Sequence, residues 1–268
     1  MSPHKTQIIM NLTLMHKTAL VCGGSRGIGL ASAQELSGLG CRCILVSRNR
    51  AHLDEALKSL PPVREAHTAI AADLGRDEDL DSLIQTLGQE TIHILINNSG
   101  GPAGGPVLEA EPAAYTDAFR QHLVSGQRLA TAVVPGMRKA AYGRIINILS
   151  TSVKAPLPNL GVSNTTRWAV AAWAKTLAGE VAPWAITVNN VLPGSTQTDR
   201  LKSLVRQQAE NQGITEEAVE NQWLSTIPMG RFGHPEEIAA LVAFLASPAA
   251  AYITGTSIQA DGGKTPVQ

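Results

Sequence analysis

Short apolar segments alternate with longer amphipathic segments along almost the whole chain. Each apolar segment is a continuous run rich in Val, Ile, Leu and Ala, which is typical of a strand buried on both faces of a parallel sheet. These runs predict strands at residues 19–22, 41–47, 67–72, 92–96, 144–149, 186–192 and 257–261. The segments between them have apolar positions at helical spacing. They predict helices at residues 30–39, 50–60, 78–87, 111–139, 163–181, 201–224 and 235–246.

The regular alternation of strand and helix predicts an α/β fold, a doubly wound parallel sheet with helices on both faces. Right-handed crossovers place the carboxyl ends of the strands along one edge, where ligands bind in sheets of this kind. With 268 residues, of which 44% are hydrophobic, the chain suits one large domain with a sizeable core. We expect an amino-terminal tail over residues 1–16 and a single domain over residues 17–268.

Charge and composition argue against several classes of partner. Lys plus Arg and Asp plus Glu both number 22, so the formal net charge is zero and nothing favours nucleic acid or an anionic membrane. No apolar run approaches the roughly 18 residues of a membrane-spanning helix, and the amino terminus lacks a secretory signal. The three cysteines lie in apolar runs and the histidines are scattered. We therefore expect reduced core thiols, a cytoplasmic protein and no metal site.

The stretch from Ala19 to Leu30 combines a predicted strand, three glycines and the start of a helix. Gly23, Gly27 and Gly29 follow the spacing G-x-x-x-G-x-G. Glycines let the backbone turn tightly and approach a pyrophosphate, and the N–H groups at the helix start face the anion. The stretch predicts a phosphate-binding corner, although the same pattern alone would also suit a turn that binds no ligand.

Further motifs follow this corner in a fixed order. They are Asp73 after the third strand, Asn97-Asn-Ser-Gly100, Gly143-Arg-Ile-Ile-Asn147, Pro193-Gly194 with Thr198, Tyr252-Ile-Thr-Gly255 and Asp261-Gly-Gly263. Together with Cys22-Gly-Gly-Ser-Arg-Gly-Ile-Gly29, they resemble the motifs of the classical short-chain dehydrogenase/reductase family over residues 16–263. Within that family the chain is similar to the 3-oxoacyl-[acyl-carrier-protein] reductases, as a divergent branch.

The resemblance implies a Rossmann-type sheet of seven strands in a single domain, with a substrate lid over residues 199–227. It also implies a small-molecule carbonyl substrate and assembly as a homotetramer or homodimer. Binding of a nicotinamide dinucleotide is implied at Gly23, Ser25, Arg26, Gly27, Ile28, Gly29, Ser47, Arg48, Asp73, Leu74, Asn98, Ser99, Gly100, Arg167, Pro193, Gly194, Thr196 and Thr198.

The end of the second strand favours NADP(H) over NAD(H). Family members that use NAD carry an acid there for the adenosine 2′-hydroxyl, whereas this chain has Ser47 followed by Arg48, with Arg26 in the glycine stretch. Two guanidiniums and no carboxylate suit a 2′-phosphate, because arginine offers charge-assisted, bidentate hydrogen bonds. A solvated Arg48 on the surface is the competing interpretation.

The catalytic pattern of the family is altered in this chain. Family members use a Tyr-x-x-x-Lys pair one helical turn apart, a serine upstream of it and an asparagine in the fourth helix. Here the serine is Ser150, the Tyr and Lys positions hold Ser163 and Arg167, and His122 best matches the asparagine. A serine hydroxyl is a far weaker acid than a phenol, and arginine stays charged. His122 is the nearby candidate whose usual pKa suits proton transfer at neutral pH.

Three functions are compatible with this altered site. The first is an NADPH-dependent carbonyl reductase in which Ser150 and Ser163 polarise the carbonyl, Arg167 holds ribose or oxyanion, and His122 or a water supplies the proton. The second is a protein that binds NADPH with little or no turnover, as a sensor or scaffold. The third is another reaction on a bound acid or lactone, with Arg167 holding the carboxylate.

Overall fold

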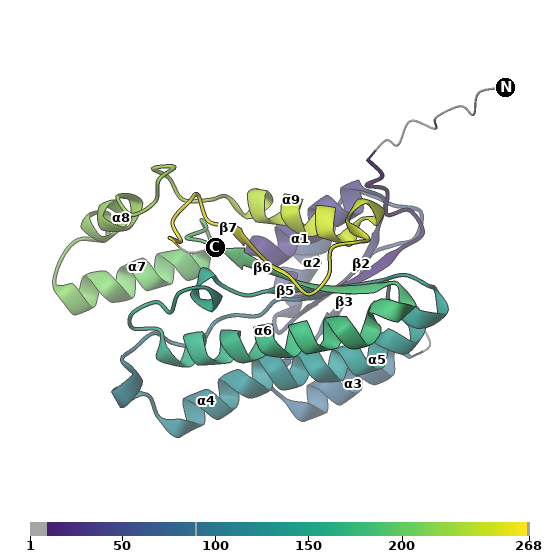
Figure 1. Ribbon diagram of the computed structural model, residues 1–268, viewed down its shortest axis with the longest axis horizontal. Coiled ribbons are helices and arrows are strands. Elements are labelled where there is room, and N and C mark those ends of the chain that lie inside the picture. The colour runs from purple at the N-terminus through teal and green to yellow at the C-terminus, as the bar shows by residue number, and fades with distance from the viewer. Residues whose placement is uncertain (1–9, 89, 267–268) are drawn as a thin grey trace.

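The computed structural model describes residues 10–88 and 90–266, and its centre is a seven-stranded sheet in the order β3-β2-β1-β4-β5-β6-β7 (Figure 1). All neighbouring strands pair in parallel. The order reverses direction beside β1, as the doubly wound prediction requires. The strands are β1 Thr18–Cys22, β2 Arg42–Ser47, β3 Thr68–Ala71, β4 Ile94–Asn97, β5 Gly143–Ile148, β6 Ile186–Pro193 and β7 Ser257–Ala260.

Helices cover both faces of the sheet. Side chains of α1, α2 and α9 form one buried cluster with the sheet, and side chains of α3, α5 and α6 form another on the opposite face. Figure 1 shows these two layers above and below the strands. The helices are α1 Gly27–Gly38, α2 Arg50–Lys58, α3 Asp77–Leu87, α4 Pro112–Phe119, α5 Ser125–Lys139, α6 Gly161–Val181, α7 Asp199–Gln212, α8 Glu216–Leu224 and α9 Pro235–Ala246.

The predicted helix at residues 111–139 is two α-helices joined by a π-helical turn at Arg120–Val124. Such turns insert one extra residue into the helical ladder and are frequent at functional sites. This one contains His122, whose side chain is buried. The sequence gives no signal for the turn, because its apolar spacing is compatible with an uninterrupted helix.

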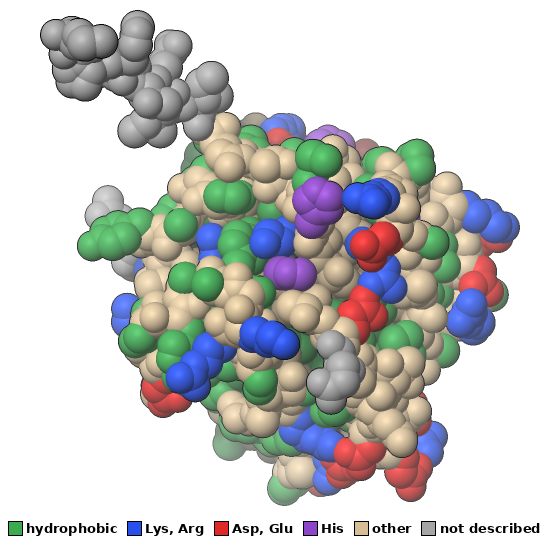
Figure 2. Space-filling view, turned by 90° about the vertical axis from the view of Figure 1, so that its right-hand side faces the viewer, with side chains coloured by type: hydrophobic (Ala, Val, Ile, Leu, Met, Phe, Trp, Pro, Cys, Tyr) green, Lys and Arg blue, Asp and Glu red, His purple; other side chains and the backbone are tan. Residues whose placement is uncertain are grey.

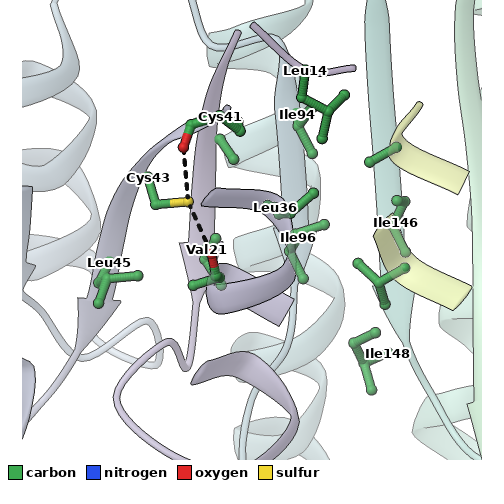
Figure 3. Close-up of a cluster of buried hydrophobic side chains, with 14 of the residues drawn as sticks. Leu14, Val21, Leu36, Cys41, Cys43, Leu45, Ile94, Ile96, Ile146 and Ile148 are labelled. Atoms are coloured by element: carbon green, nitrogen blue, oxygen red, sulfur yellow. Dashed lines mark hydrogen bonds between the residues drawn. The ribbon is translucent and has the colours of Figure 1, made fainter. Parts of the chain in front are cut away.

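The first buried cluster extends further toward the amino terminus than predicted. Leu14 is completely buried, and its N–H donates to the Leu39 carbonyl. The carboxyl end of the expected tail over 1–16 therefore packs with the domain, and residues 1–9 of that tail lie outside the described residues. Figure 3 shows Leu14 in this cluster together with Cys41 and Cys43. All three cysteines are buried and free, as expected.

A row of hydrogen-bonded polar side chains crosses four neighbouring strands, from the carboxyl end of β4 to the first residue of β7. Asn97, Asn147, Asn190 and Ser257 are register partners on β4, β5, β6 and β7. Each asparagine amide donates to the next side chain, at 2.9 Å, 2.8 Å and 3.0 Å in turn. We call these four residues the asparagine ladder. Because buried amides are costly when unpaired, the ladder stabilises the register of these four strands relative to one another.

The segment predicted as a lid forms α7 and α8, which extend from the strand ends in Figure 1. These helices have a small apolar cluster of their own. On the face turned away from them, basic and acidic side chains are interspersed with apolar ones (Figure 2). Within residues 10–88 and 90–266, no helix has the length and apolar character needed to cross a membrane.

Candidate active site

The glycine stretch forms a tight corner between β1 and α1. Gly23 has a φ of 60°, and a Cβ there would lie 2.8 Å from the Asn98 carbonyl oxygen. At Gly29 a Cβ would lie only 2.1 Å from the Gly23 carbonyl oxygen. Both positions therefore exclude any side chain. The backbone is left bare at the start of a helix, which is the arrangement that fits the pyrophosphate of a dinucleotide.

Asn98 holds this corner in place. Its Nδ2 donates to the carbonyl oxygens of Cys22 at 3.3 Å and Gly23 at 3.4 Å. The turn after β6 also reaches the corner, since Thr198 Cγ2 would be 3.3 Å from a Cβ on Gly27. Segments far apart in the sequence thus meet at the carboxyl ends of the strands.

The two arginines predicted to bind a 2′-phosphate both lie at this edge and are exposed. Arg26 pairs with Asp199 at 3.1 Å, and Arg48 lies 3.9 Å from Asp73. Exposed pairs of this kind contribute little to stability, so the guanidiniums can exchange a carboxylate for a phosphate at small cost. Ser47 is hydrogen-bonded to Ser25 at 2.9 Å.

A cavity of about 20 Å³ lies between the corner and α6. This volume is enough for about one water molecule. The cavity brings together predicted residues from both the cofactor set and the catalytic set. It is lined by Cys22, Leu74, Asn97, Asn98, Ser99, Gln121, His122, Ser125, Asn147, Ile148, Leu149, Arg167 and Val170.

His122 is buried in the wall of this cavity. Its Nδ1 is 2.7 Å from Ser99 Oγ, and its Nε2 is buried without a hydrogen-bond partner among the described residues. Burial, and then the charge of Arg167, lower the pKa of His122 to about 3. The imidazole is neutral at pH 7. The expectation of a histidine that titrates near neutral pH is therefore wrong for this environment.

Arg167, which the sequence predicts at the family's lysine position, lies on α6 and is only 8% exposed. Its Nη1 donates to the Ile148 carbonyl oxygen at 2.6 Å, at the carboxyl end of β5. Burial and the nearby Arg200 lower the pKa of Arg167 to about 10. It stays a cation at pH 7, held at the strand ends by a backbone contact.

Ser150 and Ser163 flank this region but do not line the cavity within the described chain. Ser150 Oγ accepts from the Ser152 N–H at 3.1 Å. Ser163 lies one helical turn before Arg167 on α6, so the two side chains share a face of that helix. Both serines are partly exposed. Within the described chain, neither serine is hydrogen-bonded to His122.

Within the described residues, no tyrosine lines this cavity. Tyr142 donates to the Ala246 carbonyl oxygen just before β5 begins, at the opposite end of that strand. Tyr252 is fully exposed, and Tyr115 lies on α4 outside the cavity lining.

The remaining predicted positions form the surroundings of the corner. Leu74 lines the cavity, and Ile28 packs against the core. Gly194 is in tight contact with the carboxyl-terminal strand segment, because a Cβ there would lie 2.7 Å from Asp261 Cα. Pro193 ends β6, Thr196 Oγ1 donates to the Gly194 carbonyl, and Gly100 is exposed with open space around it.

Sequence reasoning missed three features. Gly24 is as constrained as its neighbours, since a Cβ would lie 2.9 Å from the Val21 carbonyl oxygen. The asparagine ladder had a signal in the sequence, because Asn97, Asn147 and Asn190 interrupt apolar runs or directly follow them. Arg200, at the start of α7, comes close to Arg167 only through the position of the lid helices. In the described ranges, no group of three His, Cys, Asp or Glu side chains could hold a metal ion.

The chain is similar to known proteins over almost its whole length. Residues 23–265 match the family described as Enoyl-(Acyl carrier protein) reductase. The chain is 36% identical over 258 residues to the 3-oxoacyl-[acyl-carrier-protein] reductase FabG of Pseudomonas aeruginosa, covering 94% of this chain and 98% of that protein.

Two solved structures are similar over nearly their whole length. L-sorbose reductase from Gluconobacter frateurii, complexed with NADPH and L-sorbose, has a TM-score of 0.89 at 30% identity, covering 97% of this chain and 100% of that one. YwfH, an NADPH-dependent reductase involved in bacilysin biosynthesis, has a TM-score of 0.88 at 31% identity, covering 94% and 99%. The predicted Rossmann-type fold is confirmed, and this chain belongs to the short-chain dehydrogenase/reductase family.

Proposed function

We propose that this oxidoreductase uses NADP(H) to reduce a carbonyl group to an alcohol, with a site built from Arg167, His122, Ser150 and Ser163. One observation carries the proposal. The cavity beside the glycine corner is lined by both corner residues, Cys22 and Asn98, and a buried Arg167 with His122. A binding corner and a pocket that contains a buried cation are thus adjacent.

The choice of NADP(H) rests on charge and on relatives. Arg26 and Arg48 flank the corner, and no carboxylate follows β2 directly. The similar structures of L-sorbose reductase and YwfH are described with NADPH. When bound, NADPH supplies a hydride, which carries two electrons to the carbonyl carbon, and a proton must reach the oxygen.

The chain's own residues have distinct roles in this proposal. Arg167 stabilises the negative charge that develops on the oxygen, because a cation at a buried site acts strongly there. His122 is neutral, so only one of its ring nitrogens carries a proton. When the Ser99 hydroxyl donates to Nδ1, that proton is on Nε2, and Nε2–H can donate a hydrogen bond to the substrate. The net proton comes from water, with Ser150 and Ser163 as hydrogen-bonding groups at the pocket entrance.

Binding without turnover is the second candidate, favoured by the position of all three tyrosines away from the cavity. One experiment separates the two. NADPH binding is measured by fluorescence, and NADPH oxidation is then followed against ketones, aldehydes and 3-oxoacyl thioesters. Turnover with any carbonyl supports the reductase, and tight binding without turnover on the whole panel refutes it. The homotetramer or homodimer and the cytoplasmic location stay predictions.

A further inference from the structure

Two arginines converge beside the loop that follows β4. A Cβ placed on Gly101 would lie 3.5 Å from Arg200 Nη2 and 3.8 Å from Arg167 Nη2. The two guanidiniums therefore border the same point, one reaching it from α6 and the other from the start of α7. Arg200 is held there by a hydrogen bond from Nη2 to the Pro102 carbonyl oxygen at 2.6 Å.

Neither guanidinium has a carboxylate partner within residues 10–88 and 90–266. Arg167 is almost fully buried and Arg200 is partly buried. Burying two like charges together without a counter-ion is costly. The nearest neighbour of Arg200 in sequence, Asp199, points to Arg26 instead. This pair of cations lacks the anion that would balance it.

The anionic groups of the cofactor do not fill this role. Its pyrophosphate fits the bare backbone from Gly23 to Gly29, and its 2′-phosphate fits Arg26 and Arg48 at the edge of the sheet. Gly101 lies on the loop that follows β4, beyond Asn98 and Gly100, and not in the corner between β1 and α1. A buried polar atom also remains open nearby, since His122 Nε2 has no partner among the described residues.

We infer that Arg167 and Arg200 bind a carboxylate of the substrate, so that the substrate is an oxo acid rather than a neutral acyl thioester. The inference rests on the proposed function and names its substrate class. A planar carboxylate suits guanidinium donors, which can bind both of its oxygens. Arg200 belongs to the lid segment and contacts Pro102 on the facing loop, so a bound carboxylate joins the two sides of the entrance.

The test compares matched pairs of carbonyl compounds with NADPH. The pairs are 3-oxobutanoate with methyl 3-oxobutanoate, and 2-oxo-3-phenylpropanoate with its methyl ester. Loss of one charged hydrogen-bond partner changes affinity by about 10- to 100-fold. We expect the acids to exceed the esters in kcat/KM by about that factor. The variant Arg200→Gln should remove the preference by raising KM for the acids alone.

The matched control is Arg206→Gln on the same helix. Arg206 is exposed and pairs with Glu216, so this variant should keep the preference for acids. Equal rates with acids and esters, or an Arg200→Gln variant that slows both alike, would overturn the inference while leaving the reductase intact.

A binding measurement separates this inference from the proposed function. Calorimetry on the NADP⁺-loaded protein compares benzoate with benzamide, neither of which is reduced. Binding of benzoate alone, lost in Arg200→Gln, supports the carboxylate site even when no carbonyl is turned over. Equal binding of the two compounds, or binding of neither, overturns the site whatever the turnover assay shows.

Discussion

Replacing Gly29 by alanine should damage the dinucleotide corner. The added Cβ would lie 2.1 Å from the Gly23 carbonyl oxygen and 2.8 Å from Asn98 Nδ2. Ordinary contacts between such atoms are longer than 3.4 Å, and backbone atoms cannot rotate away as a flexible side chain can. The corner must therefore open, and the N–H groups at the start of α1 must move.

The size of the effect follows from the cost of overpacking. Forcing a methyl group into a filled site costs about 1–3 kcal/mol. If the free energy of NADPH binding becomes less favourable by this amount, the dissociation constant for NADPH rises by about 5- to 150-fold. The measurement is a fluorescence titration of NADPH against wild-type and variant protein, with thermal unfolding in parallel to show that both are folded.

The control lies on the same helix. Gly38 has no atom within 4 Å of the corresponding Cβ position, and alanine favours helix formation. Gly38→Ala should therefore leave NADPH affinity unchanged. The reasoning about the corner fails if Gly29→Ala binds NADPH within about twofold of wild type while the protein remains folded.

Three further predictions concern the ladder, the buried histidine and cofactor choice. Asn147→Leu leaves Asn97 Nδ2 and Asn190 Oδ1 unpaired and should lower the free energy of unfolding in urea by about 2–6 kcal/mol; a loss well below 1 kcal/mol contradicts the ladder's role. Because the folded-state pKa of His122 lies near 3, below its unfolded value, the unfolded chain binds the proton first and stability falls as pH drops below 6.5. From pH 7 to 5 the wild type should lose about 2 kcal/mol relative to His122→Asn, and parallel curves for the two proteins would show that His122 is not buried as a neutral group. Arg48→Gln should weaken NADPH binding by about 10- to 100-fold and leave NADH binding unchanged. The control is Arg50→Gln, which removes an exposed partner of Asp54. An equal loss of affinity for both cofactors contradicts recognition of the 2′-phosphate by Arg48.

The fold was predictable because buried parallel strands carry a strong local signal. Each apolar run became a strand within one or two residues, as for the run at 186–192, which became β6 Ile186–Pro193. The glycine corner was predictable for a similar reason, since its conformation depends on the glycines themselves. The start of the domain could not be predicted in the same way, because tertiary contacts decide it. Leu14 lies outside every predicted element and is nevertheless buried.

The electrostatics of the candidate site could not be predicted from the sequence. The family resemblance singled out Arg167, His122, Ser150 and Ser163, of which Arg167 and His122 line one cavity whereas the two serines do not. The neutral state of His122 depends on burial and on the charge of Arg167, neither of which is visible in the sequence. The short distance between Arg200 and Arg167 depends on the position of α7 relative to the sheet, which is a property of the whole fold.

The central claim is that the site transfers hydride from NADPH to a carbonyl carbon. The most direct test uses NADPH in which both hydrogens at C4 are deuterium, together with a carbonyl compound, followed by mass spectrometry of the product. The account predicts an alcohol with one deuterium at the former carbonyl carbon. Oxidation of NADPH without deuterium in an alcohol, or no product although NADPH binds, would contradict it.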